Sequence, residues 1–275
     1  MAGILGRVPA PTADTVTETL RPLTDAPGRG GIFLDVDGTL APIVERAEQA
    51  HVPEKTSRML GTLARRYRMV ACVSGRAAAE ARRLVGVGGI VYAGSHGAEL
   101  LEPGAARSVI LPAFESWTDR VQEFARGEDT RELRGLRVRI EDKGPIVAFH
   151  WRGAPDEDSA RTRVERIATE AETAGFTTHW GRKVLEVRPP VPVDKGQAID
   201  ELVRRSGIRA ALYAGDDATD LDAFAALERL QRDGELDAIV RVGIESEEGP
   251  AAIPERSDLV VDGMDGVALV LDALL

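Results

Sequence analysis

The sequence predicts an α/β fold in which a parallel-sheet core carries an inserted α+β domain. Short apolar runs alternate with amphipathic helical stretches before residue 107 and again after residue 190. Strand–helix–strand alternation of this kind implies a parallel sheet with right-handed crossovers. Between these two parts the order changes to helix, two strands, helix and two strands. We therefore expect a flexible leader over residues 1–26, a core formed by 27–106 and 191–275, and an inserted cap over 107–190.

The first part of the core begins with the apolar run Ile32–Leu34, which is typical of a buried parallel strand. Before it, the leader is rich in Pro, Thr and Asp and has little periodicity, apart from a short helix expected near Val16–Leu20. The next expected elements are a helix beginning at Pro53, a strand over Met69–Val73, a helix over Ala77–Val85 and a strand over Ile90–Ala93.

The inserted part has apolar spacing of both helical and strand type. Two alternating stretches surround Asp142-Lys143-Gly144-Pro145, which is a hairpin signal. The expected elements are helices over Pro112–Arg126 and Asp156–Ala174, and strands over Leu136–Glu141, Ile146–Trp151, Thr177–Trp180 and Val184–Val187. After Pro189 to Pro192 the first rhythm returns, with helices over Gly196–Arg205, Asp220–Leu230 and Val267–Leu275 and strands over Ala210–Ala214, Ala238–Val242 and Leu259–Val261.

The composition is that of an ordinary globular protein, with 43% hydrophobic and 29% charged residues. A net charge of −10 disfavours nucleic acids and anionic membranes as partners. No run approaches the ~18 apolar residues of a membrane span. The lone Cys72 lies in an apolar run and is expected to be a buried, inert thiol. We therefore expect a cytoplasmic monomer that acts on a small molecule.

Two carboxylates, Asp35 and Asp37, follow the first core strand directly, and Gly38 and Thr39 come next. The carboxyl ends of the strands are where an open α/β sheet binds ligands. Two acids there cost several kcal/mol in repulsion and desolvation unless a cation neutralises them. The structural alternative is a strand that runs into an acidic turn, because Asp-Gly is a common turn pair.

Further polar clusters fall at other strand ends or helix starts: Ser74-Gly75-Arg76, Lys195, and Asp216-Asp217 with Asp220. Each has a structural reading of its own, since Ser74 could cap a helix, Lys195 could be solvated and Asp216 could belong to a turn. All four clusters would nevertheless meet at one edge of one sheet. Clustered carboxylates with a lysine and a hydroxyl predict a site for Mg2+ and a phosphate group.

Such a site predicts phosphoryl transfer to a carboxylate. A carboxylate is ionised at neutral pH and can attack phosphorus without a base to activate it. Mg2+ and Lys195 would neutralise the phosphoryl oxygens, and Ser74 would donate a hydrogen bond to one of them. The second acid, Asp37, would protonate the departing oxygen and then deprotonate water.

The motifs DVDGTL, SGR, DKG and GDDATD resemble, in this order, the four motifs of the haloacid-dehalogenase-like phosphohydrolases. The resemblance implies a Rossmann-like core with Asp35 as nucleophile and Asp37 as acid/base, the latter also offering its backbone carbonyl to the metal. It also implies a phosphate site made by Ser74, Gly75, Arg76 and Lys195, and a Mg2+ site made by Asp35, Asp37, Asp216, Asp217 and Asp220.

Within that superfamily the chain resembles the trehalose-6-phosphate phosphatases, through the stretches GSHGAE from Gly94, EDKG from Glu141 and RKVLEVRP from Arg182. This resemblance implies hydrolysis of trehalose 6-phosphate to trehalose and phosphate, the last step of trehalose biosynthesis. It implies substrate contacts from His96, Glu141, Lys143, Glu186 and Arg188. The family motif usually ends GDDxTDE, and Leu221 stands here in place of the final Glu.

Several alternatives remain open at the level of the sequence. Glu141 and Lys143 could form a structural salt bridge, and His96 could be a capping residue in a Gly-rich turn. The substrate could be another sugar phosphate, such as a sucrose or mannosylglycerate phosphate. A non-catalytic sugar-phosphate sensor on the same fold is a third reading, and the loss of Asp35 or Asp37 would have favoured it.

Overall fold

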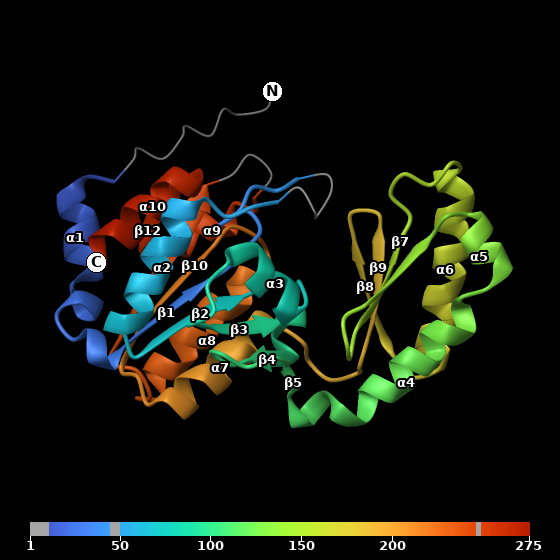
Figure 1. Cartoon of the computed structure of the whole chain (residues 1–275), viewed down its shortest axis with the longest axis horizontal. Helices are drawn as coiled ribbons and strands as arrows, with labels where there is room; N and C mark the ends of the chain where they lie inside the picture. The colour runs from blue at the N-terminus through green and yellow to red at the C-terminus, as the bar shows by residue number, and fades with distance from the viewer. Residues whose placement is uncertain (1–10, 45–49, 246–248) are drawn as a thin grey trace.

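The computed structural model describes residues 11–44, 50–245 and 249–275, and it contains two separate sheets. Eight strands form the larger sheet, in the order β12-β11-β10-β1-β2-β3-β4-β5, and four strands form the smaller one, in the order β6-β7-β9-β8. Figure 1 shows the larger sheet with its helices at the left and the smaller sheet with its helices at the right. The predicted α/β class with an inserted α+β module is confirmed.

The larger sheet is parallel from β12 to β3 and antiparallel at its β4–β5 edge. Its strands are β1 (Gly30–Leu34), β2 (Met69–Val73), β3 (Val91–Gly94), β4 (Glu99–Leu101), β5 (Val109–Ile110), β10 (Ala210–Gly215), β11 (Ala238–Glu245) and β12 (Leu259–Asp262). The strands β4 and β5 were not predicted, because two or three residues are too few to establish an alternating pattern. Since β5 belongs to this sheet, the inserted elements begin at Pro112 and not at residue 107.

Helices cover both faces of the larger sheet. The side chains of Ile32 and Leu34 point to one face and that of Phe33 to the other, as the two-residue period of a strand requires. The first face packs against α1 (Ala13–Thr24), α2 (Glu54–Arg66), α3 (Ala78–Val85) and α10 (Gly263–Ala273). The opposite face packs against α7 (Lys195–Ser206), α8 (Asp220–Arg232) and α9 (Ala252–Glu255).

Part of the stretch expected to be a flexible leader is a packed helix. Val16, Leu20 and Leu23 of α1 are buried in the same apolar cluster as β1. Their spacing of four and three residues places them on one face of a helix. Thr12 caps the helix by accepting a hydrogen bond from the Thr15 N–H. The short helix expected near Val16–Leu20 is therefore present and extends over Ala13–Thr24, so this part of the leader is packed and not flexible. Residues 1–10 lie outside the described part of the chain.

The smaller sheet is antiparallel and belongs to the inserted cap. Its strands are β6 (Arg139–Asp142), β7 (Val147–His150), β8 (Thr177–Gly181) and β9 (Val184–Arg188), and its helices are α4 (Pro112–Glu128), α5 (Arg131–Gly135) and α6 (Glu157–Thr173). Val147, Phe149, Leu185 and Val187 pack against the helices and form the core of the cap. The cap sheet lies between α6 and the larger domain (Figure 1).

The other face of the cap sheet carries polar side chains. Glu141, Ala148, Glu186 and His179 stand in one row across the four strands, in register. Since their neighbours along each strand point to the helices, this row is on the face turned to the larger domain. The cap thus presents carboxylates and a histidine to the carboxyl edge of the core sheet.

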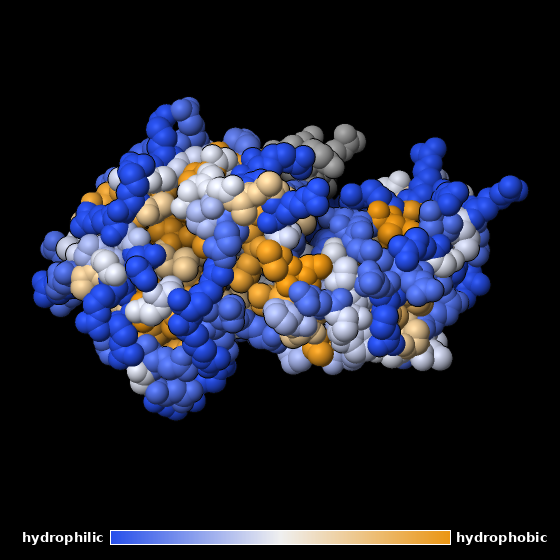
Figure 2. Space-filling view, turned by 60° about the horizontal axis from the view of Figure 1, so that its bottom comes forward, coloured by the Kyte–Doolittle hydropathy of each residue, from blue (hydrophilic) through white to orange (hydrophobic). Residues whose placement is uncertain are grey.

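The surface is mostly hydrophilic on the face seen in Figure 2, with hydrophobic residues gathered in separate patches on both domains. Among the described residues, the exposed large hydrophobic side chains are Ile43, Val109, Trp180, Leu269 and Leu275. No helix in the described ranges has the length and apolar character needed to cross a membrane.

Candidate active site

The ammonium group of Lys195 lies at the centre of the polar groups at the carboxyl edge of the core sheet. Lys195 is the first residue of α7 and is buried. Its Nζ lies 2.7 Å from Asp35 Oδ1 and 2.6 Å from Asp220 Oδ1. Burial alone would lower the pKa of Lys195, but the charges of Asp220 and Asp35 hold it well above its usual value. The solvated surface lysine considered from the sequence is excluded.

Asp35 is fixed by backbone and side-chain bonds at the end of β1. Its N–H donates to the Ala214 carbonyl of β10 at 2.9 Å, so the carboxylate leaves the sheet at its edge. One oxygen, Oδ1, accepts from Lys195. The other, Oδ2, is buried and has no hydrogen-bond partner among the described residues. Burial raises the pKa of Asp35 although Lys195 opposes the shift. One buried oxygen of Asp35 is therefore left for a ligand.

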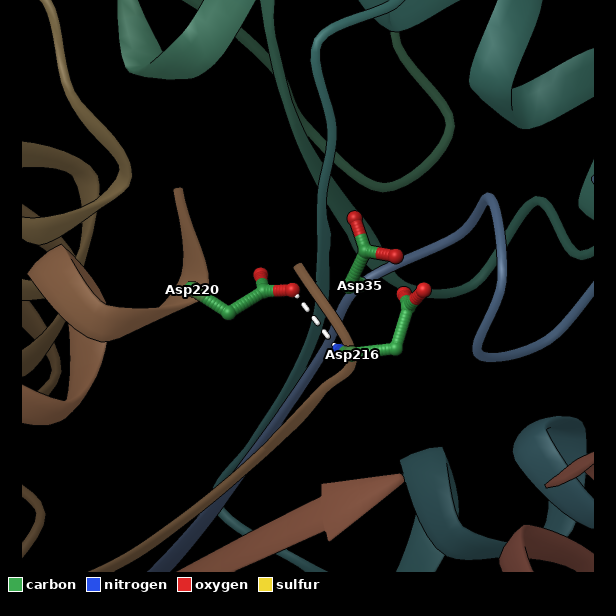
Figure 3. A group of neighbouring side chains, drawn as sticks. All are labelled: Asp35, Asp216 and Asp220. Atoms are coloured by element: carbon green, nitrogen blue, oxygen red, sulfur yellow. Dashed lines mark hydrogen bonds between the residues drawn. The ribbon is translucent and has the colours of Figure 1, made fainter. Parts of the chain in front are cut away.

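Three carboxylates, one of them that of Asp35, form a compact group at this edge of the sheet. Asp35, Asp216 and Asp220 each place one oxygen within 4.8 Å of the others (Figure 3). The oxygens of Asp220 are fully engaged: Oδ1 accepts from Lys195 and from the Tyr213 hydroxyl, and Oδ2 accepts from the backbone N–H groups of Asp216 and Asp217. Asp220 thus shapes the loop after β10.

Asp217 also serves the loop. Its Oδ1 accepts from the N–H and the hydroxyl of Thr219 at 2.8 and 2.6 Å, while its side chain is 53% exposed. Burial would raise its pKa, but Lys195 and Thr219 lower it below its usual value. The oxygens of Asp217 and Asp220 thus hold the loop, and Asp220 also belongs with Asp35 and Asp216 to the group of carboxylates that could hold a metal ion; the expectation that Asp217 and Asp220 are metal ligands stays a prediction.

The remaining groups fit a hard divalent cation. Asp35 Oδ2 is unpartnered, and Asp216 makes one long side-chain bond, 3.4 Å from the Thr39 hydroxyl. Burial, with the charges of Asp220 and Asp217, raises the pKa of Asp216 to about 7. Buried carboxylate oxygens with few partners are typical ligands for such an ion. Gly38 leaves the space, because a Cβ there would lie 2.2 Å from Asp216 Oδ2.

Asp37 is held by Arg76. Arg76 donates from Nη2 to Asp37 Oδ1 at 2.6 Å and from Nε to Oδ2 at 2.7 Å. Its Nη1 donates to Glu80 at 2.7 Å. The hydrogen bonds to Asp37 raise the pKa of Arg76, although burial opposes this shift. The guanidinium group expected to bind phosphate therefore fixes the second acid of the motif in a bidentate pair.

Ser74 and Gly75 form a tight loop after β2. Ser74 is buried, and its Oγ accepts from the Arg76 N–H at 3.1 Å. The cap residue of α3 is Ala77, so Ser74 is not the helix cap considered as its structural alternative. A Cβ on Gly75 would lie 2.7 Å from the ring of His96, so only glycine lets this ring pack on the loop.

His96 belongs to a left-handed loop beside this one. Ser95, at φ +52°, and His96, at φ +57°, open the short helix η3 (Ser95–Gly97). Left-handed φ is uncommon for residues other than glycine and is strained. His96 Nε2 lies 3.7 Å from Glu186 Oε2, and burial lowers the pKa of this imidazole although Glu186 opposes the shift. His96 therefore does not only shape the turn, because its ring also faces the carboxylate of Glu186 in the cap.

Glu186 links the cap groups. It accepts from Lys143 Nζ at 2.9 Å and from Arg188 Nε at 3.0 Å. Burial would raise its pKa, but His96, Lys143 and Arg188 together lower it strongly. Lys143 also reaches the Gly75 carbonyl of the core at 3.4 Å. Cap and core thus meet through these charged side chains.

Glu141 stands beside this group and accepts from His150 at 2.6 Å. This hydrogen bond lowers its pKa. Glu141 is paired with His150 and Lys143 with Glu186, so the Glu141–Lys143 pair considered from the sequence is not the one that forms.

A cavity of about 450 Å³ opens between the core and the cap. Of the predicted site residues it is lined by Asp35, Asp37, Gly75, Arg76, His96, Glu141, Lys143, Lys195 and Asp217. Sequence reasoning did not identify Glu80, Arg83, Arg139, His150 and Thr219, which also line it. The alternation of the strands could have indicated two of them. Arg139 precedes Ile140 on β6 and His150 follows Phe149 on β7, so both point away from the core of the cap.

The trehalose-phosphatase family model matches residues 33–252, which include both the core motifs and the cap. The chain belongs to the trehalose-phosphatase family. Among its relatives, a trehalose-phosphate phosphatase of Mycobacterium avium is 38% identical over 206 residues, 71% of this chain and 51% of that protein. An uncharacterized glycosyl hydrolase of Mycobacterium tuberculosis is 38% identical over 207 residues, 72% of this chain but only 15% of that protein. The chain thus spans at most about half of these relatives.

Solved structures agree with the family. A trehalose-6-phosphate phosphatase related protein superimposes with a TM-score of 0.63 and 28% identity over 88% of this chain and 95% of that one. A haloacid dehalogenase-like hydrolase of Bacteroides thetaiotaomicron, at 14% identity, shares the fold with a TM-score of 0.61 over 90% of this chain and 99% of that one. The expected superfamily fold is confirmed. Leu221, where the family motif usually has Glu, packs against the apolar cluster of α7 and α8.

The high pKa of Asp216 predicts how pH and metal affect stability. Its folded pKa, about 7, exceeds the ordinary value of 3.8, so the folded protein keeps a proton that the unfolded chain has lost. Without metal, the free energy of unfolding should therefore fall as pH rises from about 5 to about 8, by on the order of 3 kcal/mol from this group. A bound divalent cation favours the ionised form and should remove this slope.

The measurement is urea unfolding across this pH range, with chelator and with excess metal. Asp216→Asn is the matched control, because it has no proton to lose and should show neither the slope nor the metal response. An equal slope in Asp216→Asn would contradict the assignment of the effect to this carboxyl.

Proposed function

We propose that the protein is a Mg2+-dependent phosphatase that hydrolyses trehalose 6-phosphate to trehalose and phosphate through a phospho-aspartate at Asp35. The observation that carries this proposal is the state of Asp35. Lys195 holds one of its oxygens. The other has no partner among the described residues, and Asp35 lines a cavity whose other side chains are of the charged kind that binds sugar hydroxyls. Membership of the trehalose-phosphatase family supports the substrate. Mg2+ would be held by Asp35 and Asp216, and when bound it would neutralise the phosphoryl oxygens.

The first half of the reaction transfers the phosphoryl group to the enzyme. The free oxygen of Asp35 forms a bond to phosphorus, and the bond from phosphorus to the sugar oxygen breaks. Lys195 fixes the direction of attack because it holds the other carboxylate oxygen. Asp37 gives a proton to the departing sugar oxygen, which leaves as the trehalose hydroxyl.

The second half releases phosphate. Asp37 takes a proton from water, whose oxygen attacks phosphorus and frees the Asp35 carboxylate. For both steps Asp37 must stay near the reacting oxygens, and the bidentate pair with Arg76 keeps it there. Glu80 thus holds Arg76, and Arg76 holds the proposed acid/base Asp37 at the carboxyl edge of the core sheet.

The cap groups supply recognition of the sugar. Glu141, Lys143 and His150 line the cavity, and Glu186, which also accepts from Arg188, holds Lys143 in place. Carboxylates and ammonium groups pair with hydroxyls through charge-assisted hydrogen bonds. A site built to pair hydroxyls rejects ligands that lack them. Phosphates of sucrose or mannosylglycerate are the alternative substrates, and a non-catalytic sensor is disfavoured because Asp35 and Asp37 are both present.

Phosphate release from a panel of sugar phosphates tests the function. Trehalose 6-phosphate should give the highest kcat/KM, ahead of glucose 6-phosphate and the sucrose and mannosylglycerate phosphates. Asp35→Asn keeps the shape but removes the nucleophile, so turnover should fall by about 1000-fold or more. Near-normal turnover in Asp35→Asn would contradict the phospho-aspartate intermediate. A sugar phosphate with a higher kcat/KM would replace trehalose 6-phosphate as the proposed substrate.

Metal dependence gives a second prediction. A chelator should abolish activity and added Mg2+ should restore it. Ca2+ should inhibit, because its looser and higher coordination misplaces the attacking carboxylate. Phosphate release measured in excess chelator, with each ion added back, decides this; full activity in chelator would exclude a required metal.

The cap assignment predicts a substrate-selective defect in Glu186→Ala. The change leaves Lys143 and Arg188 without their carboxylate and should cost about 2–4 kcal/mol in binding the transition state. This corresponds to a loss of roughly 30- to 1000-fold in kcat/KM for trehalose 6-phosphate. A small aryl phosphate does not reach the cap, so its slow hydrolysis should be nearly unchanged.

Glu157→Ala is the matched control, because it removes another carboxylate–lysine pair of the cap, 2.6 Å from Lys183, away from this cavity. Both activities of this variant should equal those of the parent protein. A parallel loss of both activities in Glu186→Ala would instead assign Glu186 to the support of the fold or of the catalytic rim.

A further inference from the structure

We propose that Ser95 is a positioning residue, which fixes the cap turn that carries Lys143 against the core and thereby sets the affinity for the sugar part of the substrate. The proposal rests on the proposed function, because it takes Lys143 as a contact of the sugar. Its evidence is separate: a buried hydroxyl of the core that is bonded to the backbone of the cap.

The hydroxyl of Ser95 has one hydrogen and two acceptors, one in each domain. Ser95 is fully buried, and its Oγ lies 2.9 Å from the Lys143 carbonyl and 3.1 Å from Glu99 Oε1. Glu99 Oε1 already accepts from the Ala78 N–H at 2.8 Å. The hydrogen can therefore go to Lys143 when the cap is seated and to Glu99 when it is not, so the hydroxyl is satisfied in both states.

The backbone around Ser95 is fixed by the loop that follows β2. The Ser95 N–H donates to the Arg76 carbonyl at 2.7 Å, and the His96 N–H donates to the Ser74 carbonyl at 3.0 Å. Two successive left-handed residues point both N–H groups at the same loop, and this conformation is otherwise unfavourable for serine and histidine. The backbone of Ser95 and His96 thus bonds to the loop Ser74–Arg76, while the Ser95 hydroxyl donates to the cap.

The cap turn offers the carbonyl of Lys143 to this hydroxyl. The Lys143 N–H donates to the Ile146 carbonyl at 2.9 Å, and the Gly144 N–H donates to Asp142 Oδ1 at 2.8 Å, so the turn is closed on itself. The Lys143 carbonyl points out of the turn and is taken by Ser95. From the same residue, Nζ reaches the Gly75 carbonyl and Glu186.

It follows that Ser95 determines where the ammonium group of Lys143 stands. Without the hydroxyl, the turn keeps its internal bonds but loses its anchor to the core. The Lys143 side chain then samples more positions, and ordering it on binding costs more. Groups that bind phosphate and metal are on the core and do not depend on this anchor.

Two variants of the full chain separate the hydroxyl from the strained backbone. Ser95→Ala removes the hydroxyl and keeps a Cβ at positive φ, whereas Ser95→Gly removes the hydroxyl and the strain together. If the hydroxyl acts as proposed, both variants should raise the KM for trehalose 6-phosphate by about 3- to 10-fold with kcat less affected. The kcat/KM for a small aryl phosphate should stay within about twofold of the parent value.

The matched control is Ser57→Ala, which removes another hydroxyl-to-carbonyl bond of the core, 2.7 Å from Ser57 of α2 to the Val85 carbonyl at the end of α3. Both substrates should be handled as by the parent protein. A normal KM in Ser95→Gly beside a raised KM in Ser95→Ala would overturn the role of the hydroxyl, and so would an equal loss on both substrates.

Hydrogen exchange of the segment 142–146, measured without substrate, tests the anchor apart from the enzymatic reaction. Exchange should be faster in both Ser95 variants than in the parent protein and in Ser57→Ala. If the parent protein fails to hydrolyse trehalose 6-phosphate, the proposed function fails, while the exchange data still decide whether Ser95 anchors the turn. Unchanged exchange in both Ser95 variants overturns the proposal.

Discussion

The buried ammonium group of Lys195 is the charge on which the catalytic edge depends. Three charged groups, those of Lys195, Asp35 and Asp220, are taken out of water at one point. Removing one partner of such a buried set leaves an uncompensated charge, which costs about 3–5 kcal/mol. Because the lysine engages only one oxygen of Asp35, the other stays buried without a partner in the described part of the chain. The arrangement that stabilises the fold at this point thus also leaves free the oxygen that we propose as the nucleophile.

The order of the elements along the chain explains why this contact is possible. Lys195 starts α7 directly after the chain returns from the cap, and Asp194 caps the helix by accepting from the Gln197 N–H at 2.9 Å. Asp35 follows the end of β1, and Asp220 begins α8, the helix that follows the neighbouring strand β10. The parallel sheet brings these ends to one edge. An insertion at this place in the chain adds the surface that we propose binds the sugar, and it leaves the edge of the sheet intact.

Much of this organisation could be predicted from the sequence, and the exceptions have physical causes. The buried strands and the acids after β1 and β10 are local signals, as is the alternation in the cap. The strands β4 and β5 are too short to show a period, and only Val16–Leu20 of α1 was predicted, because its three buried residues are separated by Thr, Glu, Arg and Pro. The division of work among the acids could not be predicted. That both oxygens of Asp220 are already bonded, or that Arg76 holds Asp37, depends on side-chain geometry that the spacing of residues does not contain.

The junction of cap and core shows how binding energy can be directed to one substrate. Lys143, Arg188 and His96 surround Glu186, so these buried charges are compensated within the protein itself. A hydroxyl that enters must offer bonds at least as good as those it replaces, since an unpaired buried charge is penalised. A ligand with many hydroxyls meets this demand at several points together, whereas a small phosphate ester leaves the cluster as it is. Under the proposed function, selectivity would come from exchange of hydrogen bonds in the cap, while the buried lysine would keep the proposed nucleophile, Asp35, oriented for either ligand.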